Sequence, residues 1–124
     1  MGRKMVPFSR ELFELLSNKV EKYGYRTEIR KMFGHEVHFL NEYMFAGANE
    51  RGIYVHVGEH AKDEALGRES GAAAFEPLEG TAMKEYLLLG PEVYSDEKRL
   101  KAWLDRSHAY LLTLPPREKS NRHT

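Results

Sequence analysis

Cysteine is absent from this chain of 124 residues, which excludes disulfides, thiolate metal sites and cysteine nucleophiles. A surplus of one charge is absent too, because 19 Lys and Arg residues are balanced by 19 Asp and Glu residues. The chain therefore lacks the positive field on which sequence-independent DNA binding relies, although a local basic patch is compatible with a neutral total. No stretch approaches the roughly 18 apolar residues of a membrane span, and Pro7 with charged neighbours stands where a signal peptide needs an apolar run. We expect a cytoplasmic protein with no membrane segment.

The composition that is present suits a single globular domain. Hydrophobic residues make up 41% of the chain and charged residues 31%, a balance that can fill a core and still cover a surface. A chain of this length buries about two thirds of its unfolded surface around one core. We therefore predict one domain over residues 1–124. A mobile polar tail is expected from about residue 115, because Pro115 and Pro116 end the last helix.

The first half of the chain predicts one helix followed by a meander of strands. Ser9 is a suitable N-cap for an amphipathic helix that Gly24 can close. From residue 27 to residue 57 the pattern changes to short apolar or alternating runs between turn residues: IRKMF, EVHFL, YMFAG and GIYVHV. Such short connections require antiparallel neighbours, because parallel strands need long crossovers.

The second half predicts a short helix, two more strands and a long final helix. The short helix ends near Gly67, and the SGAAA segment after it is expected to be a loop or a frayed turn. AFEP and TAMKEYLLL are the expected strands, and the final helix runs from about Ser95 to Thr113. This order is typical of an α+β fold, a mainly antiparallel sheet of five to six strands with the N-terminal, middle and C-terminal helices packed on one face.

His35 and Glu36 begin like the zinc motif H-E-x-x-H, so a metal site has to be considered. That motif needs its second histidine four residues after the first, on one face of a helix. Phe39 occupies that position here, and the nearest histidine, His38, lies in a segment that alternates like a strand. Because odd spacing in a strand sends side chains to opposite faces, His35 and His38 are not expected to bind a metal together.

Three ring side chains remain as candidates for a binding surface. Val37 and Phe39 leave His38 on the other side of their strand, and the alternation of GIYVHV sets Tyr54 and His56 opposite its aliphatic residues. If the two strands lie close together, His38, Tyr54 and His56 gather on the outer face of the sheet. Three interpretations stay open: a half-solvated surface, an interaction or dimer surface, and a metal or small-ligand site.

No catalytic residue is predicted. The GRESGAAA segment lacks the Gly-Lys-Ser/Thr ending of a phosphate-binding loop, and no G-x-S-x-G nucleophile elbow is present. Adjacent carboxylates such as Asp63 and Glu64 diverge on a helix and suit a solvated face better than acid–base chemistry. The sequence therefore predicts neither a cofactor nor a resident metal.

The stretch RKMFG, residues 30–34, combines packing and charge. Its methionine and phenylalanine can fill core volume, and its glycine permits the backbone to turn between two strands. Arg30 and Lys31, with Arg26 nearby, form the most pronounced basic cluster next to predicted structure. These cations are either the solvated rim of a strand or contact positions for a partner.

The same RKMFG stretch resembles the N-terminal domain of the TfoX/Sxy competence regulators. The matching pieces follow in order: MFA at 44–46, IYV at 53–55, FEP at 75–77, Met83, Tyr86 and Trp103. They extend over most of the chain, from about residue 20 to residue 110. The resemblance implies an α+β domain similar to secretion chaperones and, in the longer members, a link to transcriptional control of DNA-uptake genes. It implies no catalytic residues, and His35 stands where the family usually has a second glycine.

We therefore predict a non-enzymatic regulatory or protein-interaction module. Its contact positions are expected at six residues: His38, Tyr54, His56, Arg26, Arg30 and Lys31. The expected partner is another protein, and a homodimer is compatible with the same surface. A small-ligand or metal-binding protein that uses the sheet-face histidines is the alternative, and a DNA-binding accessory factor is the third hypothesis.

Overall fold

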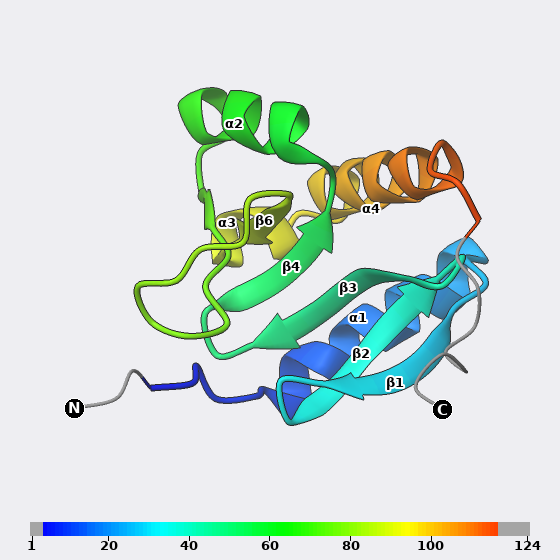
Figure 1. The fold of residues 1–124 in the computed structure, drawn as a ribbon, viewed down its shortest axis with the longest axis horizontal. Coiled ribbons are helices and arrows are strands. Elements are labelled where there is room, and N and C mark those ends of the chain that lie inside the picture. The colour runs from blue at the N-terminus through cyan, green and yellow to red at the C-terminus, as the bar shows by residue number, and fades with distance from the viewer. Residues whose placement is uncertain (1–3, 117–124) are drawn as a thin grey trace.

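The computed structural model describes residues 4–116, and Figure 1 shows the arrangement of its helices and strands. The helices are α1 (Arg10–Tyr23), α2 (Glu59–Arg68), α3 (Pro91–Tyr94) and α4 (Glu97–Leu112). The strands are β1 (Glu28–Met32), β2 (His35–Leu40), β3 (Tyr43–Asn49), β4 (Gly52–His56), β5 (Ala72–Ala74) and β6 (Tyr86–Leu89). Most of the predicted polar tail, from residue 117 onward, lies outside the described residues.

The six strands form one antiparallel sheet in the order β1-β2-β3-β4-β6-β5. Consecutive strands from β1 to β4 are neighbours, as their short connections predict. The excursion through α2 and β5 then returns the chain so that β6 pairs with β4. The predicted α+β fold, with helices before, between and after the strands of an antiparallel sheet, is confirmed.

The turn between β1 and β2 sets the register of this hairpin. Met32 is paired with His35, and the two residues between them, Phe33 and Gly34, have positive φ angles of 57° and 80°. Two consecutive left-handed residues define a type I′ turn, whose twist matches that of the strands it joins. Gly34 adopts this conformation without a steric penalty, as predicted.

The four helices contribute to a single core on one side of the sheet, here called the helix face. α1 begins after Ser9, whose hydroxyl accepts a hydrogen bond from the Leu12 N–H at 3.1 Å, and it ends at Gly24 in the left-handed conformation. The core combines buried helix residues with inward-pointing strand residues. Its larger members are Phe13, Leu16, Val20, Leu40, Phe45, Ile53, Val55, Val57, Leu87, Leu89, Val93, Leu100, Trp103, Leu104 and Leu111.

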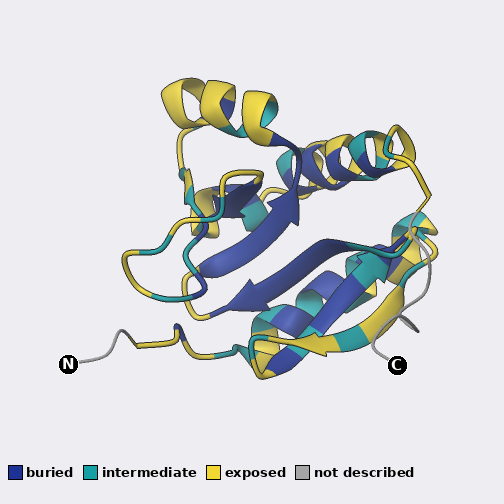
Figure 2. Cartoon of the chain, in the orientation of Figure 1, coloured by how far each residue is buried: buried dark blue, intermediate teal, exposed yellow. Residues whose placement is uncertain are grey.

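The opposite side of the sheet, here called the outer face, carries a second apolar cluster. Phe75, from the irregular segment 75–85, stacks on Tyr54 with ring centroids 3.9 Å apart. The remaining members are Val37, Met44, Tyr86 and Leu88, with Phe33, Phe39 and Met83 packed against them. The central strands β3 and β4 are therefore buried on both sides (Figure 2).

Predictions for the second half of the chain need four corrections, the first being that the expected strand TAMKEYLLL forms only over Tyr86–Leu89, which is β6. Residues 72–74, expected in a loop or a frayed turn, form β5, because pairing with β6 outweighs the weak strand preference of alanine. Residues 75–77 do not form the expected strand, since Phe75 packs onto the outer face and Pro77 has no N–H to donate. The final helix begins at Glu97, two residues later than expected, because Asp96 is its N-cap.

Candidate functional site

His38 lies on the helix face, inside the contact between β2 and α1. Its ring stacks on Phe13 with centroids 4.9 Å apart, and the residue is only 3% exposed. Nδ1 is 2.8 Å from the Thr27 hydroxyl, and Nε2 is 2.8 Å from the Ser17 hydroxyl. Burial lowers the pKa of His38 to about 4, against a smaller opposing effect of the Glu36 carboxylate. At neutral pH this ring is an uncharged part of the core.

His56 lies on the outer face at the end of β4, and both of its ring nitrogens are engaged. Nδ1 donates to the Met44 carbonyl at 2.9 Å, because a carbonyl can only accept, and Nε2 is 2.8 Å from a Glu85 carboxylate oxygen. The ring stacks on Tyr86 with centroids 4.1 Å apart, and Tyr110 approaches it edge-on. His56 thereby connects the start of β6 to the centre of the sheet.

Tyr54 and His35 are joined across the outer face. The Tyr54 hydroxyl is 2.8 Å from His35 Nε2, and the His35 ring stacks on Phe8 with centroids 5.0 Å apart. Burial raises the pKa of Tyr54 and lowers the pKa of His35, so both side chains are uncharged at neutral pH. This pair ties the tip of the β1–β2 hairpin to the central strand β4.

The expected gathering of His38, Tyr54 and His56 on a half-solvated surface is wrong. Tyr54 and His56 share the outer face, whereas His38 points to the helix face, and all three are buried. The expectation assumed that Val37 and the aliphatic side chains of β4 share one core. Val37 instead packs in the outer cluster, while Val55 packs in the helix-face core. The alternation of residues shows which side chains of one strand share a side. When both faces of the sheet are buried, it does not show which side of one strand lies on the same face as a given side of the next.

The expectation that His35 and His38 point to opposite faces is confirmed, because one contacts Tyr54 and the other contacts α1. Among residues 4–116, no three His, Asp or Glu side chains are arranged to hold a metal ion. His38 and His56 also have both ring nitrogens bonded within the protein. The geometry therefore gives no support to a ligand site built from the two.

Arg30 projects from the outer side of β1 and is surrounded by compensating groups. Its guanidinium is 2.8 Å from a carboxylate oxygen of Glu28 and 2.8 Å from one of Glu42. It also lies over the Phe39 ring, 4.9 Å from the centroid. Hydrogen bonds to the two carboxylates raise the pKa of Arg30 and balance its charge locally.

The other two predicted cations lie on different surfaces, so the three do not form one basic patch. Lys31 follows Arg30 in the strand and points to the other side of β1. Arg26 precedes β1 and lines a cavity of about 400 Å³ between the ends of α1 and α4. Neither Arg26 nor Lys31 has an ion-pair partner within the part of the chain that the structure describes.

β1 is an edge strand, and it is exposed on both of its faces (Figure 2). β2 pairs with one side of β1, and no described residue pairs with the other side. Ile29 is 49% exposed and Met32 is 40% exposed, so the expected core role of Met32 is wrong. Unpaired backbone groups beside exposed apolar side chains form a template for another strand.

The type I′ turn determines which backbone groups face this open edge. In a two-residue hairpin the residues that flank the turn, Met32 and His35, exchange both backbone hydrogen bonds. Hydrogen-bonded and non-hydrogen-bonded pairs alternate along an antiparallel ladder, so the N–H and C=O groups of Ile29 and Lys31 do not bond to β2. Those groups point outward, away from the sheet.

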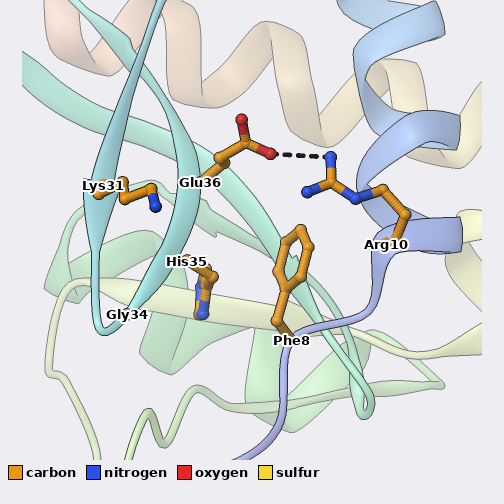
Figure 3. Close-up of a pocket in the computed structure, with 6 residues that line it drawn as sticks. All are labelled: Phe8, Arg10, Lys31, Gly34, His35 and Glu36. Atoms are coloured by element: carbon orange, nitrogen blue, oxygen red, sulfur yellow. Dashed lines mark ion pairs between the residues drawn. The ribbon is translucent and has the colours of Figure 1, made fainter.

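A small pocket adjoins the tip of the hairpin, where α1 begins (Figure 3). It has a volume of about 200 Å³ and is lined by Phe8, Arg10, Lys31, Gly34, His35 and Glu36. Arg10 and Glu36 form an ion pair at 2.8 Å, although the buried Glu36 Oε1 has no hydrogen-bond partner within residues 4–116. The carboxylate thus neutralises Arg10 and leaves Lys31 as the cation of this lining that has no partner in the described chain.

Sequence reasoning missed two neighbours of the hairpin, Phe8 and Arg10, and the ion pair that Glu36 of the hairpin forms with Arg10. Phe8 and Arg10 flank the cap of α1, and nothing in the periodicity of that helix indicates that its first turn contacts residues 31–36. Only tertiary packing brings these segments together.

Comparison with known proteins places this hairpin within a described domain family. The family model of the TfoX N-terminal domain matches residues 21–110, a range that includes every strand of the sheet and most of α4. Curated proteins and solved structures give no match. None of the helices within residues 4–116 is long and apolar enough to cross a membrane. Since the matched range covers well over half of the sequence, the chain belongs to the TfoX N-terminal domain family.

Proposed function

We propose that this TfoX N-terminal domain is a non-enzymatic protein-interaction module that binds an extended polypeptide strand along the free edge of β1. One observation carries the proposal: outward-pointing backbone groups at Ile29 and Lys31 lie beside the exposed apolar side chains of Ile29 and Met32. A strand added there forms main-chain hydrogen bonds, and the two apolar side chains supply contact area.

The surroundings of the histidines support a binding role over a catalytic one. General acid–base chemistry needs an imidazole nitrogen within reach of a substrate. The nitrogens of His38 and His56 instead bond to groups of the protein, and both residues are less than 10% exposed. We propose that the module has a regulatory role in the cytoplasm, in line with the resemblance to the N-terminal domain of competence regulators.

The proposal is tested by comparing capture of partners by edge variants of the full chain. The double variant Ile29→Lys with Met32→Lys replaces both exposed apolar side chains of β1 by cations. Leu66→Lys is the matched control, because Leu66 is 43% exposed but lies on α2, which packs against β5 and β6 at the opposite edge of the sheet. Each immobilised protein is incubated with lysate of the source cells, and every captured protein is then purified and titrated against the three proteins by calorimetry.

We expect a purified partner that binds the unmodified chain and Leu66→Lys with equal affinity and binds the double variant at least about tenfold more weakly. Circular dichroism spectra and melting temperatures confirm that all three proteins are folded. Equal affinity of a partner for the edge variant and for the control would show that binding occurs elsewhere on the domain.

A further inference from the structure

We propose that the strand that adds to β1 is β1 of a second copy of this chain, so that two six-stranded sheets join across a twofold axis. The inference rests on the proposed function, because it names the partner of the same edge. Its basis is the charge pattern of β1, which is complementary to itself in a single antiparallel register.

Backbone geometry limits the registers that two copies of β1 can adopt. Hydrogen bonds cross the edge only between residues whose N–H and C=O groups point outward, which in β1 are Ile29 and Lys31. A twofold axis that passes between two neighbouring residues opposes outward groups to inward ones and forms no ladder. A twofold axis that passes through one residue position places that residue opposite the same residue of the second copy. Outward-pointing groups then face outward-pointing groups, so the pairing must be centred on a residue.

The charges of β1 distinguish among these centres. Centring on Glu28 sets two carboxylates opposite each other, and centring on Arg30 or Lys31 sets two cations opposite each other. Like charges in directly opposite positions destabilise a strand pair. Centring on Ile29 sets Glu28 opposite Arg30 of the second copy and Arg30 opposite Glu28 of the second copy. Centring on Met32 opposes no two charged residues of β1, so the Ile29 register alone of the five forms two oppositely charged pairs.

The same register also covers the exposed apolar side chain at its centre. Ile29, which is 49% exposed, faces Ile29 of the second copy on the twofold axis. Glu28 and Arg30 are already 2.8 Å apart within one chain, so pairing produces four charges of alternating sign on the face of the strands opposite to the two isoleucines. Charged side chains on an edge strand normally prevent pairing with other strands. The charges of β1 disfavour pairing with most other strands, but they are complementary to the charges of a second β1.

A contact through one five-residue strand is smaller than a standard stable interface, so we expect a dimer that dissociates in the micromolar range. The register can be tested by cross-linking, because the chain has no cysteine of its own. In the proposed pair the two Cα atoms of residue 29 lie about 5.5 Å apart, within the range of a disulfide. Residue 31 of one copy is about 14 Å from residue 31 of the other, which is too far.

The experiment compares full-length Ile29→Cys with Lys31→Cys under mild oxidation by glutathione disulfide. Both cysteines are exposed on the same side of the same strand, so random collision links them at similar rates. We expect Ile29→Cys to form disulfide dimers at least about tenfold faster than Lys31→Cys at protein concentrations where sedimentation detects the dimer. Equal rates, or faster linking of Lys31→Cys, would reject the register.

A charge-exchange experiment tests the pairing without a cross-link. Glu28→Arg alone and Arg30→Glu alone each convert the two cross-strand pairs into like-charge pairs, so each variant is expected to be monomeric. In an equimolar mixture, the arginine introduced at position 28 of one variant faces the glutamate introduced at position 30 of the other. Opposite charges are thereby restored, so the mixture is expected to form heterodimers. Melting temperatures check that the loss of the Glu28 and Glu42 contacts of Arg30 has not unfolded Arg30→Glu. A mixture that stays monomeric contradicts the proposal.

These outcomes separate the partner from the function. A monomeric chain whose Ile29→Lys, Met32→Lys variant loses binding of a different purified protein rejects self-pairing and assigns the edge to that protein. A dimer that persists in this double variant places the dimer contact elsewhere and also rejects the inference.

Discussion

The imidazole of His38 and the ring of Phe13 lie nearly parallel, with an interplanar angle of 22°, in the contact that joins the sheet to the first helix. Both nitrogens of His38 are satisfied by the hydroxyls of Ser17 and Thr27. Within residues 4–116 no carboxylate is hydrogen-bonded to the ring, so a proton added there would place a positive charge in the core with only distant compensation from Glu36. The packing of α1 on the sheet therefore depends on an uncharged His38.

This dependence predicts a loss of stability in mild acid. The ordinary pKa of 6.5 applies in the unfolded chain, and burial lowers the pKa of folded His38 to about 4. Above pH 6.5 the ring is neutral in both states and has no effect. As the pH falls below 6.5, the unfolded state takes up the proton first, and the free energy of unfolding decreases by about 3 kcal/mol down to pH 4.

The prediction is tested by measuring the free energy of unfolding in urea for the native chain and for His38→Gln at a series of pH values. Glutamine can bond to the hydroxyls of Ser17 and Thr27 but carries no titrating group. The difference in stability between the two proteins should therefore shift in favour of the variant between pH 6.5 and pH 4. Parallel curves across that interval would mean that His38 is protonated equally in both states.

The order of the first four strands could be predicted from the sequence, but the face of the sheet on which each side chain lies could not. The meander β1 to β4 was predictable because its runs alternate and its turns are short, and Gly34 marks the first turn. Partner faces were not predictable, because Val37 and Val55 look alike in sequence but belong to different clusters. A sheet that is buried on both sides removes the polar alternation by which an outer face is normally recognised.

The candidate site was predictable only in part for a related reason. Arg30 and Lys31 were found because they are adjacent cations, but adjacency in a strand places them on opposite sides. The exposure of Ile29 and Met32 could not be predicted from the sequence. An edge strand and a central strand built from the same residues have the same pattern of apolar and polar positions. That distinction depends on the order of strands, which is a property of the whole fold.

Gly47 provides a test of the outer-face packing. It is paired with Tyr54 across β3 and β4, and a methyl group at Gly47 would overlap the Tyr54 ring. We expect Gly47→Ala to lower the free energy of unfolding by about 1–3 kcal/mol because the ring must leave its stack on Phe75. Gly67→Ala is the control, since no atom lies within 4 Å of its added methyl group and α2 gains helix propensity.

Chemical denaturation of the two alanine variants decides this point. We expect Gly67→Ala to be as stable as the native chain or up to about 1 kcal/mol more stable. In a Tyr54→Leu background the cost of Gly47→Ala should become smaller, because the overlapping ring is absent. An unchanged cost in that background would show that the strain arises from the backbone of β3 and not from the ring.

Ser107 tests how α4 is attached to a β-bulge. The register of β2 and β3 shifts between His38 and Phe39, so Phe45 is the extra residue of a β-bulge in β3. The buried Ser107 hydroxyl approaches the Phe45 carbonyl at 3.3 Å and donates to the His56 carbonyl at 2.7 Å. Ser107→Ala removes the donor and is expected to cost about 1–2 kcal/mol of stability.

The intrinsic preference of helices for alanine opposes this loss, so a control for propensity is needed. Ala109→Ser places the reverse change on the exposed side of the same helix and measures the propensity difference alone. The cost of Ser107→Ala, corrected by that difference, should remain clearly positive in thermal and urea unfolding. A corrected value near zero would mean that water replaces the hydroxyl at the bulge.

Tyr23 and Glu97 connect the end of α1 to the start of α4 and predict a measurable titration. The Tyr23 hydroxyl donates to Glu97 at 2.8 Å, and Lys22 contacts the same carboxylate at 2.6 Å. Burial, with this hydrogen bond as the next cause, raises the pKa of Tyr23 to about 12. In Glu97→Gln the phenol loses its charged acceptor, so its ionisation, followed by the carbon-13 signal of Cζ, should move toward the ordinary value of 10 without reaching it. The control is Asp105→Asn, which removes a carboxylate of α4 that contacts Tyr25 and should shift the pKa of Tyr23 less than Glu97→Gln does. Equal shifts would mean that the overall charge, and not the hydrogen bond to Glu97, controls the pKa of this phenol.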